Sequence, residues 1–271
     1  MKMIHAVTAL ALVVACALPQ AARAHKMWIV PSATVLSGGD AWVTVDAAIS
    51  NDLYYPDHFP APMDRIEVTA PDGTAVAPEN AATGKFRSTF DVHLARPGTY
   101  RIALRNDGVF ANYTLAGEKK RWRGAAGELA KAIPVEAIDI KVSESVSRVE
   151  SFVTAGATSQ GVFKPTNRGL ELAPVTHPND LASGEKATFR LLLDGKPAAG
   201  IKVTAIVGAT RYRDVAGELD TTTAADGSFS FTWPAAGMYW VSASTEDNKV
   251  SVKPATERRL AYTATLEVLP Q

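Results

Sequence analysis

The chain has 271 residues, with 28 basic and 28 acidic side chains, a formal net charge of zero and a single cysteine. This balanced charge argues against a nucleic-acid partner, because phosphate binding needs a basic face that releases counterions. After the first 24 residues, no stretch approaches the roughly 20 apolar residues that span a bilayer. We therefore expect a well-packed globular protein with no membrane span in its mature form.

Residues 1–24 have the pattern of a secretory signal peptide. Lys2 gives the positive start, residues 4–18 are mostly apolar, and Ala22-Arg23-Ala24 provides small residues for the peptidase. This pattern predicts cleavage between Ala24 and His25 and a periplasmic location. Cys16 would leave with the signal, so the mature chain would have no thiol and no disulfide. The alternative is a lipobox at residues 13–16, which would make the protein a lipoprotein anchored through Cys16.

Short alternating runs bounded by turn residues follow the signal. They predict strands at residues 41–45, 65–69, 86–94 and 99–104. Equivalent runs in the second half predict strands at residues 186–193, 201–207, 228–233 and 237–243. A Gly-x-Tyr step precedes one strand in each half and predicts a tyrosine corner at Tyr100 and another at Tyr239.

The repeated pattern predicts an all-β protein of two tandem β-sandwiches, Ig-like or carboxypeptidase-regulatory-like, over residues 25–156 and 168–271. An insertion at residues 107–137 interrupts the first sandwich. Within it, residues 125–132 have helical composition and Pro134 would end the helix. The basic run at residues 118–123 predicts a solvated face, or a contact with an acidic partner or lipid head groups.

Four segments resemble an exported family, the domain of unknown function DUF4198, also described as NikM-like or nickel-uptake substrate-specific. They are residues 24–32, 169–181, 194–200 and 226–229, and the resemblance extends over nearly the whole mature chain. It implies a periplasmic accessory protein of a transition-metal uptake system, often for nickel or cobalt. Because the mature chain lacks membrane helices, only the metal-binding part of this implication is carried over.

Cleavage before His25 would leave an imidazole and an α-amine on one residue. An α-amine ordinarily has a pKa of about 7.7–8.0, so a metal ion displaces its proton at modest cost. The amine, the His25 Nδ1 atom and one further imidazole would form a three-nitrogen histidine brace, which suits copper and tolerates nickel. The structural alternative is that His25 only follows the cleavage site and begins a strand that packs Trp28 into the core.

The second imidazole must come from the other mature histidines. His58 ranks first because it lies in a loop rich in proline and aromatic residues, with Asp57 as a carboxylate ligand or as the group that orients His58. His177 ranks second, in a His-Pro turn at the domain junction that could be purely structural. His93, in the middle of a strand, ranks third.

The leading functional hypothesis is a periplasmic accessory protein that binds nickel, cobalt or copper through the mature N-terminus. Its partner would be an outer-membrane or inner-membrane uptake component. The first alternative is an Ig-like interaction protein that scaffolds an outer-membrane receptor without metal. The second is a copper oxidoreductase, although no motif names a reaction and we do not expect an enzyme.

Overall fold

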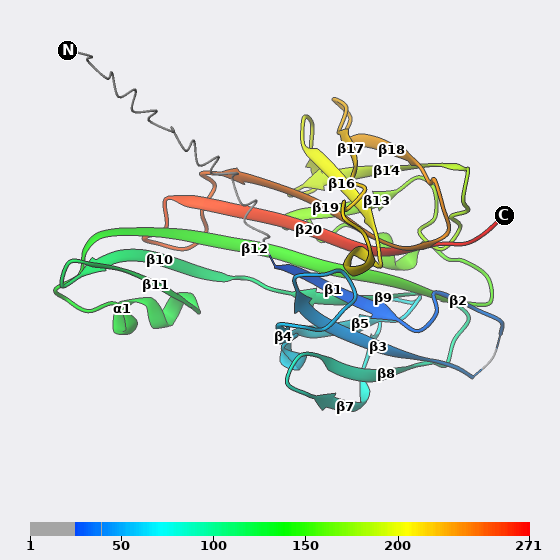
Figure 1. Ribbon diagram of the computed structural model, residues 1–271, viewed down its shortest axis with the longest axis horizontal. Helices are drawn as coiled ribbons and strands as arrows, with labels where there is room; N and C mark the ends of the chain where they lie inside the picture. The colour runs from blue at the N-terminus through cyan, green and yellow to red at the C-terminus, as the bar shows by residue number, and fades with distance from the viewer. Residues whose placement is uncertain (1–24, 39) are drawn as a thin grey trace, which may run out of the picture.

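The computed structural model describes residues 25–38 and 40–271 (Figure 1). The expected signal peptide, with Cys16, lies outside the described residues. Nearly all the regular structure is β-strand, as the sequence predicts. Two apolar clusters form the main cores, one for each half of the chain.

The first core lies between two facing sheets. One sheet contains β1 (Lys26–Pro31), β3 (Ala41–Ser50), β4 (Phe59–Pro60), β7 (Glu79–Thr83) and β8 (Ser88–Leu94). The opposite sheet contains β5 (Ile66–Thr69), β6 (Ala75–Val76), β9 (Gly98–Arg105) and the end of β12 (Ile138–Ala155), with β2 (Val35–Leu36) at its margin. Alternate side chains of β8, including Phe90 and Val92, are fully buried, which is the period-2 pattern of a strand that covers a core.

The second core is built in the same way. One sheet contains β13 (Leu170–Pro174), β14 (Lys186–Leu193), β15 (Lys196–Pro197) and β18 (Ser228–Thr232). The other contains β16 (Lys202–Val207), β17 (Leu219–Thr222), β19 (Gly237–Asp247) and β20 (Glu257–Val268). The expected strands of this half therefore form a β-sandwich, with Phe189, Trp233 and Tyr239 at its centre.

The two sandwiches share one sheet. Residues 143–151 of β12 pair in parallel with residues 257–265 of β20, so a single sheet runs through both halves of the molecule. Figure 1 shows these two long strands side by side along the middle of the structure. Neither segment was predicted to be a strand from the sequence. The expected division at residues 157–167 falls between β12 and β13, but the halves are joined by backbone hydrogen bonds rather than by a linker alone.

Both tyrosine corners are present. The Tyr100 hydroxyl donates to the Arg96 carbonyl at 3.0 Å, and the Tyr239 hydroxyl donates to the Ala235 carbonyl at 2.9 Å. Each ring is buried in the core of its sandwich. Each tyrosine therefore ties a turn to the strand that follows it.

The insertion at residues 107–137 differs in part from the expectation. It forms a hairpin of β10 (Gly108–Leu115) and β11 (Glu118–Gly124), which projects as an arm beside the start of β12 (Figure 1). The expected helix is confined to α1 (Leu129–Ala132), after a 3₁₀ turn at Ala126–Glu128. The basic run therefore lies in strand β11. Among the described residues, no helix has the length and apolar character needed to cross a membrane.

Candidate functional site

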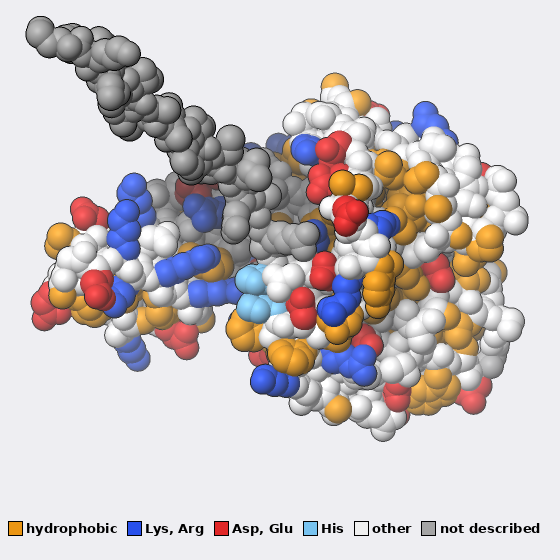
Figure 2. Space-filling model, in the orientation of Figure 1, with side chains coloured by type: hydrophobic (Ala, Val, Ile, Leu, Met, Phe, Trp, Pro, Cys, Tyr) orange, Lys and Arg blue, Asp and Glu red, His pale blue; other side chains and the backbone are white. Residues whose placement is uncertain are grey.

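Two of the predicted site residues, His25 and His58, lie against each other. His25 directly precedes β1 and His58 directly precedes β4, and both strands pair with the same end of β3. Their imidazole rings are stacked, with centroids 3.7 Å apart and planes within 9°. Histidine side chains are visible at the surface in Figure 2, where the arm meets the body of the molecule.

Two tryptophans, one from each half of the chain, fix the start of β1. The Trp28 indole donates to the Ser50 hydroxyl at 2.7 Å and is almost fully buried. From the second sandwich, the Trp240 indole donates to the Met27 carbonyl at 3.0 Å. Trp28 also packs with Leu53 and Ile206 in a small cluster between the two sandwiches. The position of His25 therefore depends on contacts from both halves.

The loop that presents His58 is held from within and from outside. Asp57 accepts hydrogen bonds from the Asn51 backbone at 2.9 Å and from its side-chain amide at 3.3 Å. The Leu53 backbone donates to the Thr210 hydroxyl at 3.0 Å, which ties the loop to the second sandwich. In this geometry Asp57 shapes the loop that carries His58, and both of its carboxylate oxygens accept hydrogen bonds from Asn51.

The stacked imidazoles provide two nitrogen ligands but not a complete metal site. Lone pairs of an imidazole lie in the ring plane, so two parallel rings do not aim at one point, and one ring must rotate to share an ion. His25 is exposed, which leaves it room to turn. Within residues 25–38 and 40–271, no group of three or more histidine or carboxylate side chains could hold a metal ion. A free α-amine on His25 would supply a third nitrogen beside the two imidazoles.

The structure does not bring His177 to this pair. Its Nε2 atom lies 3.1 Å from the Thr99 hydroxyl and 3.3 Å from the Ser159 carbonyl, and its Nδ1 atom accepts from the Asn179 backbone at 3.1 Å. Burial lowers the pKa of His177, which favours the neutral ring, against an opposing hydrogen bond to Ser159 and the charge of Asp180. This is the environment of a structural histidine at the junction of the sandwiches.

His93 also lies elsewhere. Its ring stacks on Trp42, with centroids 4.4 Å apart and planes within 6°, and its Nε2 atom lies 2.5 Å from the Asp40 carboxylate. These contacts form a surface cluster on the outer face of the first sandwich. His58 is therefore the histidine that the fold places beside His25, and its role as a ligand stays a prediction.

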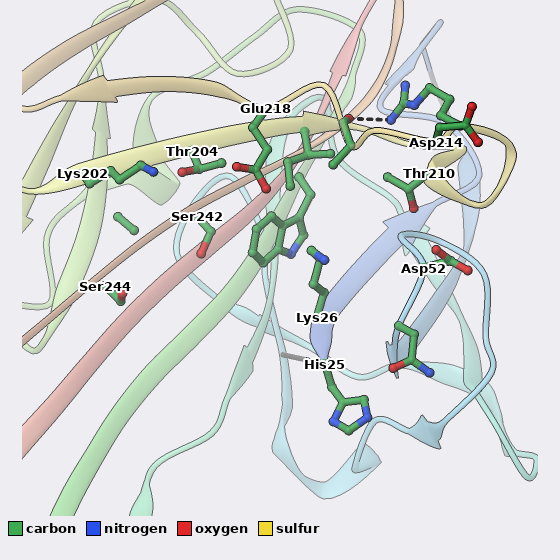
Figure 3. A pocket seen from close by; sticks show the side chains of 16 residues that line it. His25, Lys26, Asp52, Lys202, Thr204, Thr210, Asp214, Glu218, Ser242 and Ser244 are labelled. Carbon is green, nitrogen blue, oxygen red and sulfur yellow. Dashed lines mark hydrogen bonds between the residues drawn. The ribbon is translucent and has the colours of Figure 1, made fainter. Parts of the chain in front are cut away.

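A cleft of about 530 Å³ opens beside the histidine pair. Its walls come from the start of β1, residues 51–52, strands β16 and β19, and the segment at residues 210–218. Figure 3 shows Lys26 directed into this space, while the His25 ring lies at its edge and turns away. The cleft is not apparent from the sequence, because its residues converge only when the two sandwiches pack together.

Several solved structures resemble this chain at low identity. They include the D0–D1 domain of intimin, with 13% identity, coverage of 89% of this chain and 97% of that chain, and a TM-score of 0.22. α-2-macroglobulin from Escherichia coli has 12% identity, with coverage of 92% and 16% and a TM-score of 0.22. The human OSCAR ligand-binding domain has 14% identity, with coverage of 90% and 99% and a TM-score of 0.21. At these scores the matches carry no argument, and the assignment as a β-sandwich protein rests on the sheets themselves.

No curated protein matches the sequence significantly. The family model described as "Domain of unknown function (DUF4198)" matches residues 22–247, which is most of the chain. This match includes the first sandwich, both stacked histidines and every residue that lines the cleft, and it does not distinguish a NikM-like subfamily. The chain belongs to the DUF4198 family.

Proposed function

We propose that this protein is an exported accessory protein that binds a transition-metal ion at its processed N-terminus and delivers it to an uptake system. Nickel, cobalt and copper are the candidate ions, and the periplasm is the proposed location. The observation that carries the proposal is the contact between His25 and His58, with ring centroids 3.7 Å apart. Two imidazoles from distant parts of the sequence meet at the residue where the signal pattern predicts cleavage.

The chemistry needs both the cleavage and the contact. Cleavage before His25 frees an α-amine, which can close a chelate ring with the Nδ1 atom of the same residue. After one ring rotates, the His58 imidazole would add a third nitrogen. An all-nitrogen site of this kind suits copper and nickel, and copper would bind most tightly in the usual order of divalent ions. The ion is cargo in this proposal, and the choice of an uptake component as recipient rests on the family resemblance of the sequence.

The test compares the exported protein with a form that carries one extra residue before His25. Intact mass first establishes that the native form begins at His25, and calorimetric titration then measures nickel, cobalt and copper binding. We expect the extra residue to weaken binding by more than the roughly 10–100-fold that loss of an outer-shell partner costs. A matched control carries the extra residue after Gln271. Equal affinity of the two N-terminal forms, or a native chain that begins at Cys16, would overturn the proposal.

The arm supports a second candidate, a metal-independent interaction protein. Lys119, Arg121 and Arg123 alternate along β11, so they share one side of the hairpin, and all three are exposed. The guanidinium groups of Arg121 and Arg123 lie 5.1 Å and 5.0 Å from the centroid of the Phe110 ring. Burial lowers the pKa of Arg123, as do the charges of Arg65 and Arg121, so this face concentrates positive charge.

This candidate predicts a membrane-receptor partner that remains bound in the presence of a chelator. Replacing Arg121 and Arg123 with glutamine should release that partner, whereas the same change at Arg87, in the first sandwich, should not. A partner lost on chelation would favour the metal-binding proposal instead.

A further inference from the structure

The cleft beside the histidines has the dimensions of a small-molecule site. Its volume of about 530 Å³ lies within the range of roughly 300–1,000 Å³ that is typical of ligand pockets. Strands β16 and β19 direct alternate side chains, such as Val203 and Val241, into the second core. The intervening residues line the cleft. An outer sandwich face normally meets solvent, but here the start of β1 and residues 210–218 enclose it.

The walls of the cleft carry charges of both signs. The Lys26 side chain extends into the cleft (Figure 3) and forms no ion pair with any described side chain. Glu218 directs its carboxylate into the cleft from the segment opposite (Figure 3) and, within the described part of the chain, is likewise without an ion-pair partner. The carboxylates of Asp52 and Asp214 lie at the margin of the cleft, and that of Asp214 turns away from it. Opposite charges that share a cleft without pairing are suited to a ligand that carries both.

The other cations of the cleft are already engaged. Lys202 lies 3.0 Å from the Asp220 carboxylate. The Arg213 guanidinium donates to the Val207 carbonyl at 2.7 Å and to the Ala216 carbonyl at 3.0 Å, which holds the enclosing segment in place. Lys26 is therefore the cation best placed to receive a carboxylate from a ligand.

The remaining walls can hold the body of a small organic molecule. Trp240 supplies an aromatic surface, and its position is fixed because its indole donates to the Met27 carbonyl at 3.0 Å. Thr204 and Ser242 lie opposite each other on β16 and β19 and add hydroxyl groups. The Thr204 hydroxyl donates to the Asp220 carboxylate at 2.6 Å and can therefore only accept from a ligand, whereas the Ser242 hydroxyl can donate or accept.

We propose that this cleft is a second ligand site, for a small aminocarboxylate zwitterion. Its carboxylate would bind the Lys26 ammonium, its ammonium would face Glu218, and its side chain would pack on Trp240. A dicarboxylate would meet Glu218, and a diamine would meet Lys26, so each is disfavoured at one of its ends. This site does not depend on metal binding at the histidine pair.

The test titrates the full exported protein, with EDTA present, with three probes of similar length: L-glutamine, glutarate and 1,5-diaminopentane. Calorimetry measures affinity, and the indole NMR signal of Trp240, identified by its absence in Trp240→Phe, reports the location. We expect glutamine to bind and to shift this signal, with the other two probes at least about 10-fold weaker. The proposal is overturned if glutamine fails to bind at millimolar concentration, or if either the dicarboxylate or the diamine binds as tightly.

Two variants locate the binding. Lys26→Gln should weaken glutamine by about 10- to 100-fold, the loss expected when a hydrogen bond to a charged group is removed. Ser242→Phe should fill the cleft and abolish binding, with its folding checked by circular dichroism. Lys196→Gln, an exposed lysine on β15, is the matched control and should leave affinity unchanged. Unchanged glutamine binding in Lys26→Gln, or in a folded Ser242→Phe protein, would show that the ligand binds elsewhere and would overturn the proposal.

Discussion

His25 and His177 lie beyond opposite ends of strand β1, yet their surroundings have little in common. His25 is exposed at the start of β1, and its ring contacts another imidazole. His177 is buried beyond the other end of β1. There the Thr154 backbone donates to the Thr34 carbonyl, and the Thr154 hydroxyl lies 2.9 Å from the Thr99 hydroxyl. Thr99 in turn contacts His177.

This difference separates a histidine whose ring is available to a metal ion, His25, from one whose ring nitrogens already form hydrogen bonds within the fold, His177. Hydrogen bonds engage both ring nitrogens of His177, so binding a metal there would require breaking them. The exposed ring of His25 lies beside His58, and it can reorient without loss of core packing. Mutation beside His25 should therefore change metal binding more than stability, whereas mutation of His177 should change stability more than metal binding.

The largest effect should follow from Trp28→Ala, because this residue supports β1 as a whole. Loss of the buried indole should lower the free energy of unfolding by about 3–5 kcal/mol. It should also displace His25 and weaken metal binding. Urea unfolding and metal titration measure the two effects, with Trp28→Phe as the milder control. Native metal affinity in a folded Trp28→Ala protein would show that β1 does not position the ligands.

At the open end, His58→Ala should act on binding and not on folding. We expect metal affinity to fall by about 10-fold or more. The free energy of unfolding should stay within about 0.5 kcal/mol of that of the native protein. His93→Ala is the matched control, since it also removes a histidine that stacks on an aromatic ring. An equal loss of affinity in both variants would contradict a site at the stacked pair.

At the closed end, His177→Ala should give the reverse result. Removal of its hydrogen bonds leaves partners such as the Asn179 backbone unsatisfied, which should cost about 1–3 kcal/mol of stability. Metal affinity should remain native. Chemical denaturation and titration of the same preparation decide the matter, and a loss of metal binding would place His177 in the site after all.

A smaller effect is expected from Trp240→Phe, which removes the indole donor to the Met27 carbonyl while it keeps an aromatic ring. Loss of one hydrogen bond of this kind should destabilise the protein by about 0.5–1.5 kcal/mol. Thermal unfolding measures the change. Phe152→Leu, a change in the shared β12 strand, provides a comparison that alters packing in the second core and leaves the indole hydrogen bond to Met27 in place.

The smallest effect concerns pH. Burial lowers the pKa of His177 below its ordinary value near 6.5, so the unfolded chain takes up a proton before the folded one. The contribution of His177 to the free energy of unfolding is therefore fully present when the pH is above the pKa of the unfolded chain. It is lost as the pH falls towards the lower pKa of the folded protein. Urea unfolding between pH 7.5 and 5 should show this decline, and His177→Gln should reduce its slope. An identical slope in the variant would assign the decline to other groups.

Local patterns in the sequence predicted much of the fold. The alternation at residues 186–193 matches β14, and the Gly-x-Tyr steps predicted both tyrosine corners, because these features depend on neighbouring residues. The hairpin of β10 and β11 was missed because Ala116 and Gly117, both with positive φ, form a turn without the usual Asn-Gly signal. The β12–β20 pairing was missed because parallel pairing is a long-range contact, and β12 carries buried Arg148 and Glu150, which mask its strand pattern.

In the candidate site, too, local features could be predicted from the sequence and long-range features could not. His25 and His58 could be singled out from the cleavage pattern and from the loop composition. The cleft could not, because Lys26, Trp240 and Glu218 come from three segments that only the packing of the two sandwiches brings together. The sequence also gave no indication that Asp57 turns towards Asn51, since that depends on the path of the loop.

The shared sheet limits how this molecule can recognise anything that enters between its halves. Binding proteins made of two lobes commonly close by swinging about a flexible hinge. In this chain the continuous ladder of β12 and β20 over residues 143–151 and 257–265 resists such a swing, because opening would break consecutive backbone bonds. A ligand of the proposed cleft would then be recognised through side-chain rotation and loop adjustment within a rigid frame. Its binding would avoid the cost of domain closure, and its selectivity would be set by a gap of nearly fixed width.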